Sequence, residues 1–317
     1  MKRVIFLMAM AMILGQPAEA KKKKKKDDKT EKKEAPVTQG LFSVQKEGDK
    51  WFLLVPDSLM GRPFLAITRY VSTPSGIGLY GGEEVNEQTF YWENANNGNL
   101  LLRSLIYLSA ADSTQSIARA VKASAQDPIV ESFKIESTKR DSAKNASYKV
   151  EISRLFNKEN IAVGIDNNTK KRLGLSAMNT DRSFIKAINT YPINTEIKTI
   201  RTYNSPSPAG QTAGVVTFEM NTSFVMLPKD PMRKRLFDPR VGYFVNYFEP
   251  YTDDQQSVKR KRFICRWRLE PRDEDIEKMK RGELVEPKKQ IVYYIDPATP
   301  KQWRPYLIQG VNDWNAA

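Results

Sequence analysis

Hydrophobic and polar residues alternate in short runs along most of the chain, and turn residues separate the runs. Short runs rich in branched and aromatic side chains and bounded by Gly, Asn or Pro are typical of β-strands. In 263–269, for example, Phe263, Cys265, Trp267 and Leu269 alternate with other residues and are expected on one face. The pattern predicts strands over 41–46, 50–56, 64–71, 89–93, 100–108, 129–135, 148–152, 196–203, 215–227, 263–269 and 291–295.

The spacing of these runs indicates how the strands connect. Glu47, Gly48 and Asp49 form the predicted turn of a hairpin between the first two runs, and Asn96-Asn-Gly separates 89–93 from 100–108. Strands this short and this closely spaced favour antiparallel pairing. We therefore expect a mainly β (α+β) fold, with antiparallel, sandwich- or barrel-like β-rich domains and a few short helices.

Two segments before residue 290 have the sequence signals of helices instead of alternation. In 116–125, Ile117 and Val121 recur on one side, and Pro128 limits the segment. In 273–281, acidic residues fill the first turn, basic residues fill the last, and Gly282 follows where a left-handed C-cap belongs. Both segments are predicted helices.

The predicted strand 291–295 precedes a third helical segment. Thr299 can cap this helix, with Pro300 in its first turn and Gln302 completing a capping box, while Pro305 favours a start one turn later. Its apolar residues recur at helical spacing and form one stripe: Trp303, Leu307, Val311 and Trp314. A strand followed by a helix is the usual opening of a domain, so we expect one to begin here.

The first twenty residues have the pattern of a secretory signal peptide. Met1, Lys2 and Arg3 are followed by an apolar run from Val4 to Gly15 and by the small-x-small cleavage site Ala18-Glu-Ala20. The run is shorter than the ~20 apolar residues of a membrane-spanning helix. We therefore expect no transmembrane segment and an exported protein of the periplasm, the cell surface or the extracellular space.

Charge separates a second segment from the rest of the chain. The net charge is +14, and residues 21–34 hold nine lysines and four acidic residues. Such a run repels itself and has nothing apolar to bury, so a disordered linker is expected. Export makes nucleic acid a poor partner for this charge. The expected order is a signal peptide (1–20), a Lys-rich disordered linker (21–36), a small β-rich domain (37–93), a larger β-rich domain (94–286) and an opening strand and helix (287–317).

The chain contains no histidine and one cysteine, Cys265. No Ser-His-Asp or Cys-His pair can form, which excludes hydrolysis by those activated nucleophiles. Catalytic zinc sites almost always use histidine ligands, which one cysteine cannot replace, and one cysteine cannot form an intramolecular disulfide. The sequence predicts no catalytic, cofactor-binding or metal-ligating residue, and no cofactor, within this chain.

Three further features are candidate binding sites, and a structural interpretation is favoured for each. Gly76-Ile-Gly78-Leu-Tyr-Gly81 fits a dinucleotide-binding pattern, but an aromatic strand follows it in place of a helix, so a loop is expected. The pairs Glu83-Glu84 and Asp253-Asp254 lack the spacing of a calcium loop and are expected to be solvated. The basic clusters 233–235 and 259–262 are expected on exposed turns.

Segments over nearly the whole mature chain carry a family resemblance. They are the lysine-rich start, Gly40-Leu-Phe-Ser-Val, Val55-Pro-Asp-Ser-Leu, Val225-Met-Leu-Pro, Asp238-Pro-Arg-Val-Gly-Tyr-Phe, Arg266-Trp-Arg-Leu-Glu, Leu284-Val-Glu-Pro-Lys-Lys, and Ile291-Val-Tyr-Tyr-Ile-Asp through Gly310-Val-Asn-Asp-Trp-Asn-Ala. Together they resemble the N-terminal region, composed of domains of unknown function, of exported bacterial zinc-dependent metalloproteases of metzincin type. The segments at Asp238 and Arg266 are the most specific when they occur together in this order.

The resemblance implies that residues 287–317 are the first strand and helix of an α/β catalytic domain. In the family, the zinc-binding His-Glu-x-x-His helix lies further along the chain. The present sequence ends before it, so no zinc ligand or catalytic base is carried over onto any residue here. We expect a truncated, non-catalytic N-terminal (pro- or ancillary) region, inactive alone, that shields the active site, assists folding or docks substrate. Its expected partners are the missing catalytic domain, where zinc is expected, and a protein or peptide substrate.

Two alternatives remain open beside this interpretation. In some secreted zinc proteases a lone cysteine of the propeptide caps the metal, but the alternating pattern around Cys265 favours burial as a packing residue. The chain as a whole can also be a self-sufficient exported β-sandwich module that binds protein or glycan. Such a module is expected to pack residues 290–317, whereas a docking region is expected to expose the stripe from Trp303 to Trp314.

Overall fold

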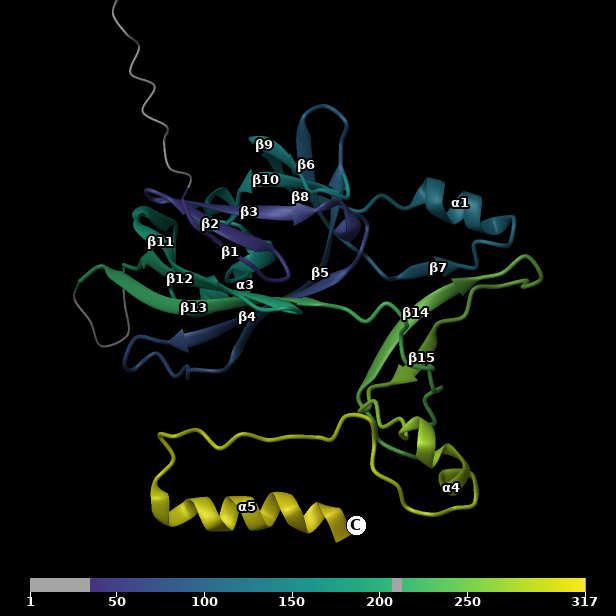
Figure 1. Cartoon of the computed structure of the whole chain (residues 1–317). Helices are drawn as coiled ribbons and strands as arrows, with labels where there is room; N and C mark the ends of the chain where they lie inside the picture. The colour runs from purple at the N-terminus through teal and green to yellow at the C-terminus, as the bar shows by residue number, and fades with distance from the viewer. Residues whose placement is uncertain (1–34, 207–212, 317) are drawn as a thin grey trace, which may run out of the picture. The chain divides into compact units, whose positions relative to one another are not determined.

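The computed structural model describes residues 35–206 and 213–316 (Figure 1). The predicted signal peptide and nearly all of the predicted Lys-rich linker lie outside these residues. The described part of the chain is mainly antiparallel β-structure with a few short helices, which confirms the predicted fold class. None of its helices has the length and apolar character needed to span a bilayer.

The largest sheet has seven antiparallel strands and curls into a half-barrel. Its strand order is β11-β12-β13-β4-β5-β6-β8. The bounds along the chain are β4 (Phe64–Ser72), β5 (Glu84–Asn94), β6 (Asn99–Ser104), β8 (Ile129–Lys134), β11 (Met178–Thr190), β12 (Asn194–Asn204) and β13 (Val215–Met226).

A second sheet has five strands in the order β1-β2-β3-β10-β9. Its strands are β1 (Val37–Thr38), β2 (Ser43–Glu47), β3 (Lys50–Pro56), β9 (Ser137–Arg140) and β10 (Ala146–Glu151). The predicted hairpin is present as β2 and β3, with Gly48 in the turn at a φ of 59°. Gly98, in the predicted turn between β5 and β6, also has a positive φ, of 85°. Both turns therefore use the left-handed conformation that glycine adopts most readily.

Residues 37–93 and the residues after them contribute strands to the same sheets. In the five-stranded sheet β3 pairs with β10, and in the seven-stranded sheet β4 pairs with β13 and β5 pairs with β6. The described residues from Pro36 onward form one compact unit. The expected domain boundary at residue 93 therefore does not separate the sheets, because strands before this residue pair with strands after it in both sheets.

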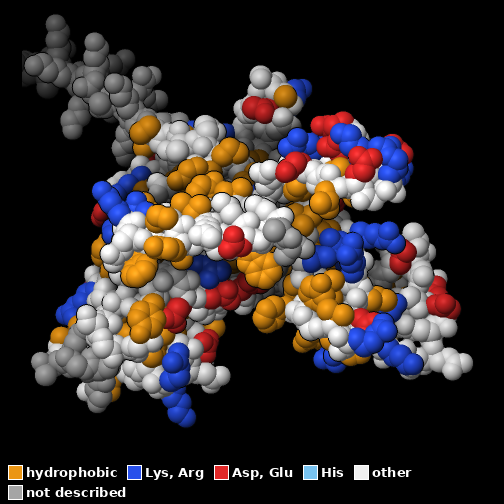
Figure 2. Space-filling view, turned by 90° about the horizontal axis from the view of Figure 1, so that it is seen from below, with side chains coloured by type: hydrophobic (Ala, Val, Ile, Leu, Met, Phe, Trp, Pro, Cys, Tyr) orange, Lys and Arg blue, Asp and Glu red, His pale blue; other side chains and the backbone are white. Residues whose placement is uncertain are grey.

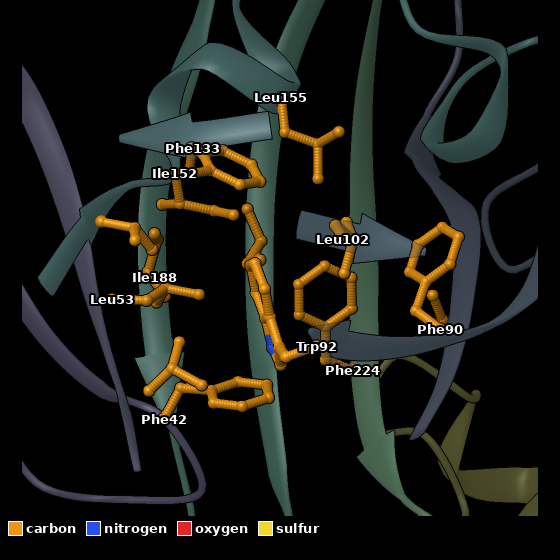
Figure 3. Close-up of a cluster of buried hydrophobic side chains, with 14 of the residues drawn as sticks. Phe42, Leu53, Phe90, Trp92, Leu102, Phe133, Ile152, Leu155, Ile188 and Phe224 are labelled. Carbon is orange, nitrogen blue, oxygen red and sulfur yellow. The ribbon is translucent and has the colours of Figure 1, made fainter. Parts of the chain in front are cut away.

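The main core contains residues of both sheets (Figure 3). Phe64 is fully buried with its ring centroid 5.2 Å from that of Phe224, and Trp92 lies 5.6 Å from Phe133. Leu53 of β3 and Val150 of β10 belong to the same cluster. The strict alternation of buried residues along β4 and β13 explains why these two strands were predictable from the sequence.

A smaller core lies under another part of the seven-stranded sheet. It joins Tyr70, Tyr203, Val216, Phe218 and Met220 with residues of the preceding loops. Every hydrophobic residue buried in the described structure belongs to the segment from Leu41 to Phe224. We call residues 36–226 the body and residues 227–316 the arm.

The third sheet joins the arm to the body through three short strands. Its order is β15-β14-β7, and β14 pairs with β15 antiparallel and with β7 parallel. The bounds are β7 (Ser109–Ala111), β14 (Val245–Tyr251) and β15 (Lys261–Ile264). The helices are α1 (Ile117–Ser124), α2 (Ser153–Phe156), α3 (Asn167–Arg172), α4 (Ile276–Lys280) and α5 (Arg304–Asn312), with 3-10 turns at Asp57–Leu59, Ile161–Val163, Asp273–Asp275, Lys301–Trp303 and Asp313–Ala316.

Three strand predictions were too long or wrong. The strand predicted over 100–108 ends at Ser104, and the one predicted over 263–269 ends at Ile264. Residues 291–295 do not form a strand, although their sequence favours one, because no neighbouring described segment pairs with them. Exposed Trp267 and Tyr294 show that alternation alone does not bury a side chain without a facing sheet.

The predicted helices are present with small shifts. Helix α1 lies within 116–125, and a 3-10 turn followed by α4 covers 273–280, with Gly282 at a φ of 86° as the expected C-cap. Helix α5 begins at Arg304 with Pro305 in its first turn and without a side-chain cap. The predicted cap Thr299 instead accepts a hydrogen bond at its carbonyl oxygen from Arg304 Nε at 2.9 Å.

Candidate functional site

The glycine-rich segment 76–81 is a loop, as predicted. It connects β4 to β5, and Gly76 and Gly78 adopt positive φ values of 81° and 72°. A strand follows the loop, so no helix N-terminus is available to bind a pyrophosphate. The segment is a connection between two strands of the half-barrel.

The two acidic pairs have structural partners. Glu83 accepts a hydrogen bond from the backbone of Tyr80, and Glu84 lies 3.6 Å from Arg69. Asp253 accepts hydrogen bonds from the backbone N–H groups of Ser116 and Ile117, at 3.0 and 2.8 Å. The Asp253 carboxylate thereby caps α1 from a loop far along the chain.

No three or more His, Cys, Asp or Glu residues are grouped as metal ligands anywhere in the described structure.

The two basic clusters predicted on exposed turns lie side by side. Phe237 donates its backbone N–H to Arg262 at 3.0 Å, and Ile264 donates to Arg235 at 3.1 Å. These bonds and the bridge between Leu236 and Phe263 pair the chain after the first cluster with β15, which contains part of the second. The sequence pattern gave no sign of this pairing, because it depends on a contact between residues far apart in the chain.

A groove of about 670 Å³ lies where these segments meet β14. We call it the basic groove. Phe248 and Phe263 are stacked in it, with ring centroids 5.1 Å apart and planes 9° apart. The ammonium group of Lys234 lies over both rings, at 4.3 Å from the Phe248 centroid and 5.2 Å from the Phe263 centroid. A cation over an aromatic face is attracted by the ring quadrupole, which fixes Lys234 at the groove.

Four cationic side chains of the basic groove have no carboxylate partner among the described residues: Arg233, Lys234, Arg235 and Arg266. Arg266 is half-buried and donates from Nη2 to the backbone carbonyl of Arg233 at 2.9 Å. By contrast, Arg260 at the nearby end of the hairpin is paired with Glu249 at 3.1 Å. The groove therefore holds positive charge that the surrounding described residues do not neutralise.

Cys265 is exposed and lines the same groove. The prediction that it is a buried packing residue was wrong. Strand β15 ends at Ile264. The backbone N–H of Cys265 still donates to the carbonyl of Phe244 at 2.8 Å, but the Cys265 side chain is not covered. The thiol is consequently open to solvent and to reagents.

The arm is a second feature of functional interest. From Val225 to Asn315 no described residue is buried, yet twenty large hydrophobic side chains after Phe224 are exposed, against ten before it. Phe244 and Tyr294 are exposed to 90% and 92%. Figure 2 shows hydrophobic side chains spread over one face of the molecule, with Lys and Arg side chains between them. The arm thus carries apolar surface without a core of its own.

Helix α5 presents the predicted apolar stripe to solvent. Leu307 and Val311 of α5 are exposed, as are Trp303 and Trp314 in the 3-10 turns that flank it, and Tyr306 and Ile308 of α5 are exposed too. Trp303 and Tyr306 contact each other, with ring centroids 6.2 Å apart. No residue of α5 is buried, so the stripe has no partner in the described structure.

Comparison with known proteins gives two family matches. Residues 24–73 match the model of a domain of unknown function, DUF5118, and residues 82–272 match that of another, DUF5117. No curated protein and no solved structure matches the chain. The DUF5117 range includes every residue that lines the basic groove and ends before α4 and α5. Because this match covers more than half of the sequence, the chain belongs to the DUF5117 family.

Proposed function

We propose that the chain is the non-catalytic N-terminal region of a secreted zinc-dependent metalloprotease and that its arm, which ends in the predicted first strand and helix of the catalytic domain (287–317), packs against the rest of that domain. The proposal rests on one observation: Phe224 is the last buried residue of the described chain. Beyond this residue the described chain buries nothing, although it exposes twenty large hydrophobic side chains. Extensive exposed apolar surface on a soluble protein is typical of a region that a protein partner covers.

The stripe on α5 is the part of the arm best suited to such a contact. Trp303 and Trp314 are exposed to 54% and 80%. Covering a large apolar side chain contributes about 1.5–3 kcal/mol, and tryptophan is enriched among the residues that dominate protein–protein binding. We therefore expect α5 to contribute a large share of the docking energy.

The exposure of this stripe supports a docking region over a self-sufficient binding module. A self-sufficient module needs its own terminal elements packed against its core. Here the nearest core residue in the sequence, Phe224, precedes Trp303 by a long stretch in which no described residue is buried. The exposed apolar surface of the arm is explained if the rest of the catalytic domain covers it.

The proposed identity of the partner depends on the resemblance of the chain to zinc-dependent metalloproteases. The residues of this chain do not fit a zinc site themselves, since it has no histidine and one cysteine. The hydrolytic chemistry therefore belongs to the partner in this proposal. The arm would hold the partner's folded domain, and the body would supply the rigid support for the arm.

The chain alone provides the first test. Purified in the presence of zinc and then dialysed, it is expected to hold far less than one zinc per chain by elemental analysis and to leave casein intact. Zinc-dependent cleavage that a chelator abolishes would contradict the proposal.

The second test uses the catalytic domain. The coding sequence beyond residue 317 is read for a His-Glu-x-x-His motif, and the encoded domain is expressed separately and titrated with the chain. We expect binding that the double substitution Trp303→Ala and Trp314→Ala weakens by roughly 30-fold or more. The control Tyr80→Ala removes an aromatic side chain that is 73% exposed on the body and is expected to leave the affinity unchanged. Absence of the motif, absence of binding, or equal weakening by both variants would overturn the proposal.

A further inference from the structure

The basic groove is a second site, separate from the apolar stripe of α5. We infer that it binds an acidic peptide segment, with Arg233, Lys234, Arg235 and Arg266 contacting the carboxylates. This inference goes beyond the docking role of the arm, because it concerns a different surface and a different chemistry.

The first argument is the unneutralised charge. Backbone pairing holds residues 235–237 against β15, and Arg266 Nη2 donates to the carbonyl of Arg233, so the four cations line one groove although like charges repel. No carboxylate among the described residues pairs with any of the four. A concave surface lined with cations of one sign concentrates anionic ligands, so the groove is expected to attract one.

The second argument decides which kind of anion fits. Nucleic acids and neutral sugars use open aromatic faces, on which bases or sugar rings stack. In the groove, Phe248 and Phe263 are stacked on each other and Lys234 lies over both. The nearby Tyr247 ring is also covered, by the guanidinium of Arg260 at 4.4 Å. The rings of Phe248, Phe263 and Tyr247 therefore support cations. Tyr107, which also lines the groove and is exposed to 63%, offers a single free ring, whereas successive bases stack on several aromatic side chains.

The third argument is the match between the groove and a peptide. Guanidinium groups bind carboxylates through two parallel hydrogen bonds, and three of the four cations are arginines. The volume of about 670 Å³ lies within the range of sites that take small ligands or short segments of chain. Val245 and Phe263 give the groove an apolar part, which suits an apolar side chain between two acidic ones.

The test uses the full chain and a fluorescein-labelled peptide of sequence Glu-Asp-Phe-Glu-Asp, followed by fluorescence anisotropy. We expect saturable binding that falls as salt rises. The peptide Gln-Asn-Phe-Gln-Asn is expected not to bind. The double substitution Arg233→Gln and Arg235→Gln is expected to weaken binding of the acidic peptide by roughly 10- to 100-fold. These side chains donate none of the hydrogen bonds that hold the groove together, and circular dichroism checks the fold.

The control variant removes the same amount of charge elsewhere. Lys278→Gln with Lys280→Gln alters two lysines of α4 that are paired with Asp275 and Glu277, and it is expected to leave binding unchanged. Cys265 supplies an independent readout, since a bound peptide is expected to slow its reaction with a thiol reagent at least several-fold.

Any one of three results with the peptides would overturn the inference. They are equal binding of the amide peptide, equal loss in both double variants, and unchanged reactivity of Cys265 at saturating acidic peptide. Tighter binding of oligothymidylate or of a sulfated oligosaccharide would also overturn it, in favour of a polyanion site. The peptide assay contains no catalytic domain, so its failure can be distinguished from failure of the docking proposal.

Discussion

Individual side chains show where stability is concentrated. Trp92 is fully buried, between Phe42, Phe64 and Phe133, with ring centroids 6.2, 6.4 and 5.6 Å away. Trp303 is the same residue type on an exposed helix. The sequence pattern placed Trp92 in a predicted strand and Trp303 on the apolar stripe of a predicted helix, but only the packing of distant strands determines that Trp92 is covered.

Substitutions of Trp92 and Trp303 are expected to have very different effects on the free energy of unfolding. Trp92→Ala is expected to lower the free energy of unfolding by about 3–5 kcal/mol, because it removes a large side chain and leaves a cavity. Trp303→Ala is expected to change it by less than about 0.5 kcal/mol. Urea unfolding followed by circular dichroism measures both. Similar losses in the two variants would show that α5 packs against a core in solution.

Tyr70 is expected to make the stability of the folded protein depend on pH in the alkaline range. Burial raises the pKa of Tyr70 to about 12 from 10.0, and its hydroxyl is buried without a hydrogen-bond partner among the described residues. The folded state favours the neutral hydroxyl, so this contribution to stability is present below pH 10 and is lost as the pH rises from 10 to about 12.

The substitution Tyr70→Phe is therefore expected to stabilise the protein by about 1 kcal/mol near neutral pH, since it removes an unpaired buried hydroxyl. It is also expected to reduce the loss of stability between pH 10 and about pH 12, measured by urea unfolding at each pH. Tyr80→Phe, on an exposed residue, serves as the control. A variant that loses stability at neutral pH would show that the hydroxyl has a partner.

At the scale of elements, predictability depended on unbroken periodicity. Strands β4 and β13 alternate without interruption, and both were predicted. Strand β11 was missed, because register shifts between Asn179 and Phe184 and between Ile185 and Ala187 break its alternation. Residues 291–295 have strand-like residues and form no strand, because a strand also requires a neighbour.

Helix α1 provides a prediction at this scale. Asp253 caps it through two backbone hydrogen bonds from a different part of the chain. Asp253→Ala is expected to speed amide exchange in α1 by about fivefold, as loss of an N-cap does. Exchange in the seven-stranded sheet is expected to stay the same. Asp254→Ala, on the neighbouring residue, is the control, and equal effects of both substitutions would contradict the capping role.

For the molecule as a whole, the division between body and arm is the main structural finding. The body has two sheets around an aromatic core, and the arm contributes no buried residue in the described structure. The sequence allowed the fold class and the apolar stripe of α5 to be predicted. It did not reveal the basic groove, because the approach of 233–235 to β15 is a long-range contact that no local pattern encodes.

Hydrogen exchange of the arm, read by mass spectrometry with and without the catalytic domain, tests the docking proposal most directly. In the chain alone, amides of residues 290–316 are expected to exchange rapidly, because α5 buries no residue and lacks a side-chain cap. With saturating catalytic domain, the same amides are expected to become protected while those of β4 and β13 stay unchanged. Protection of residues 290–316 in the chain alone, or no change on adding the catalytic domain, would contradict the account.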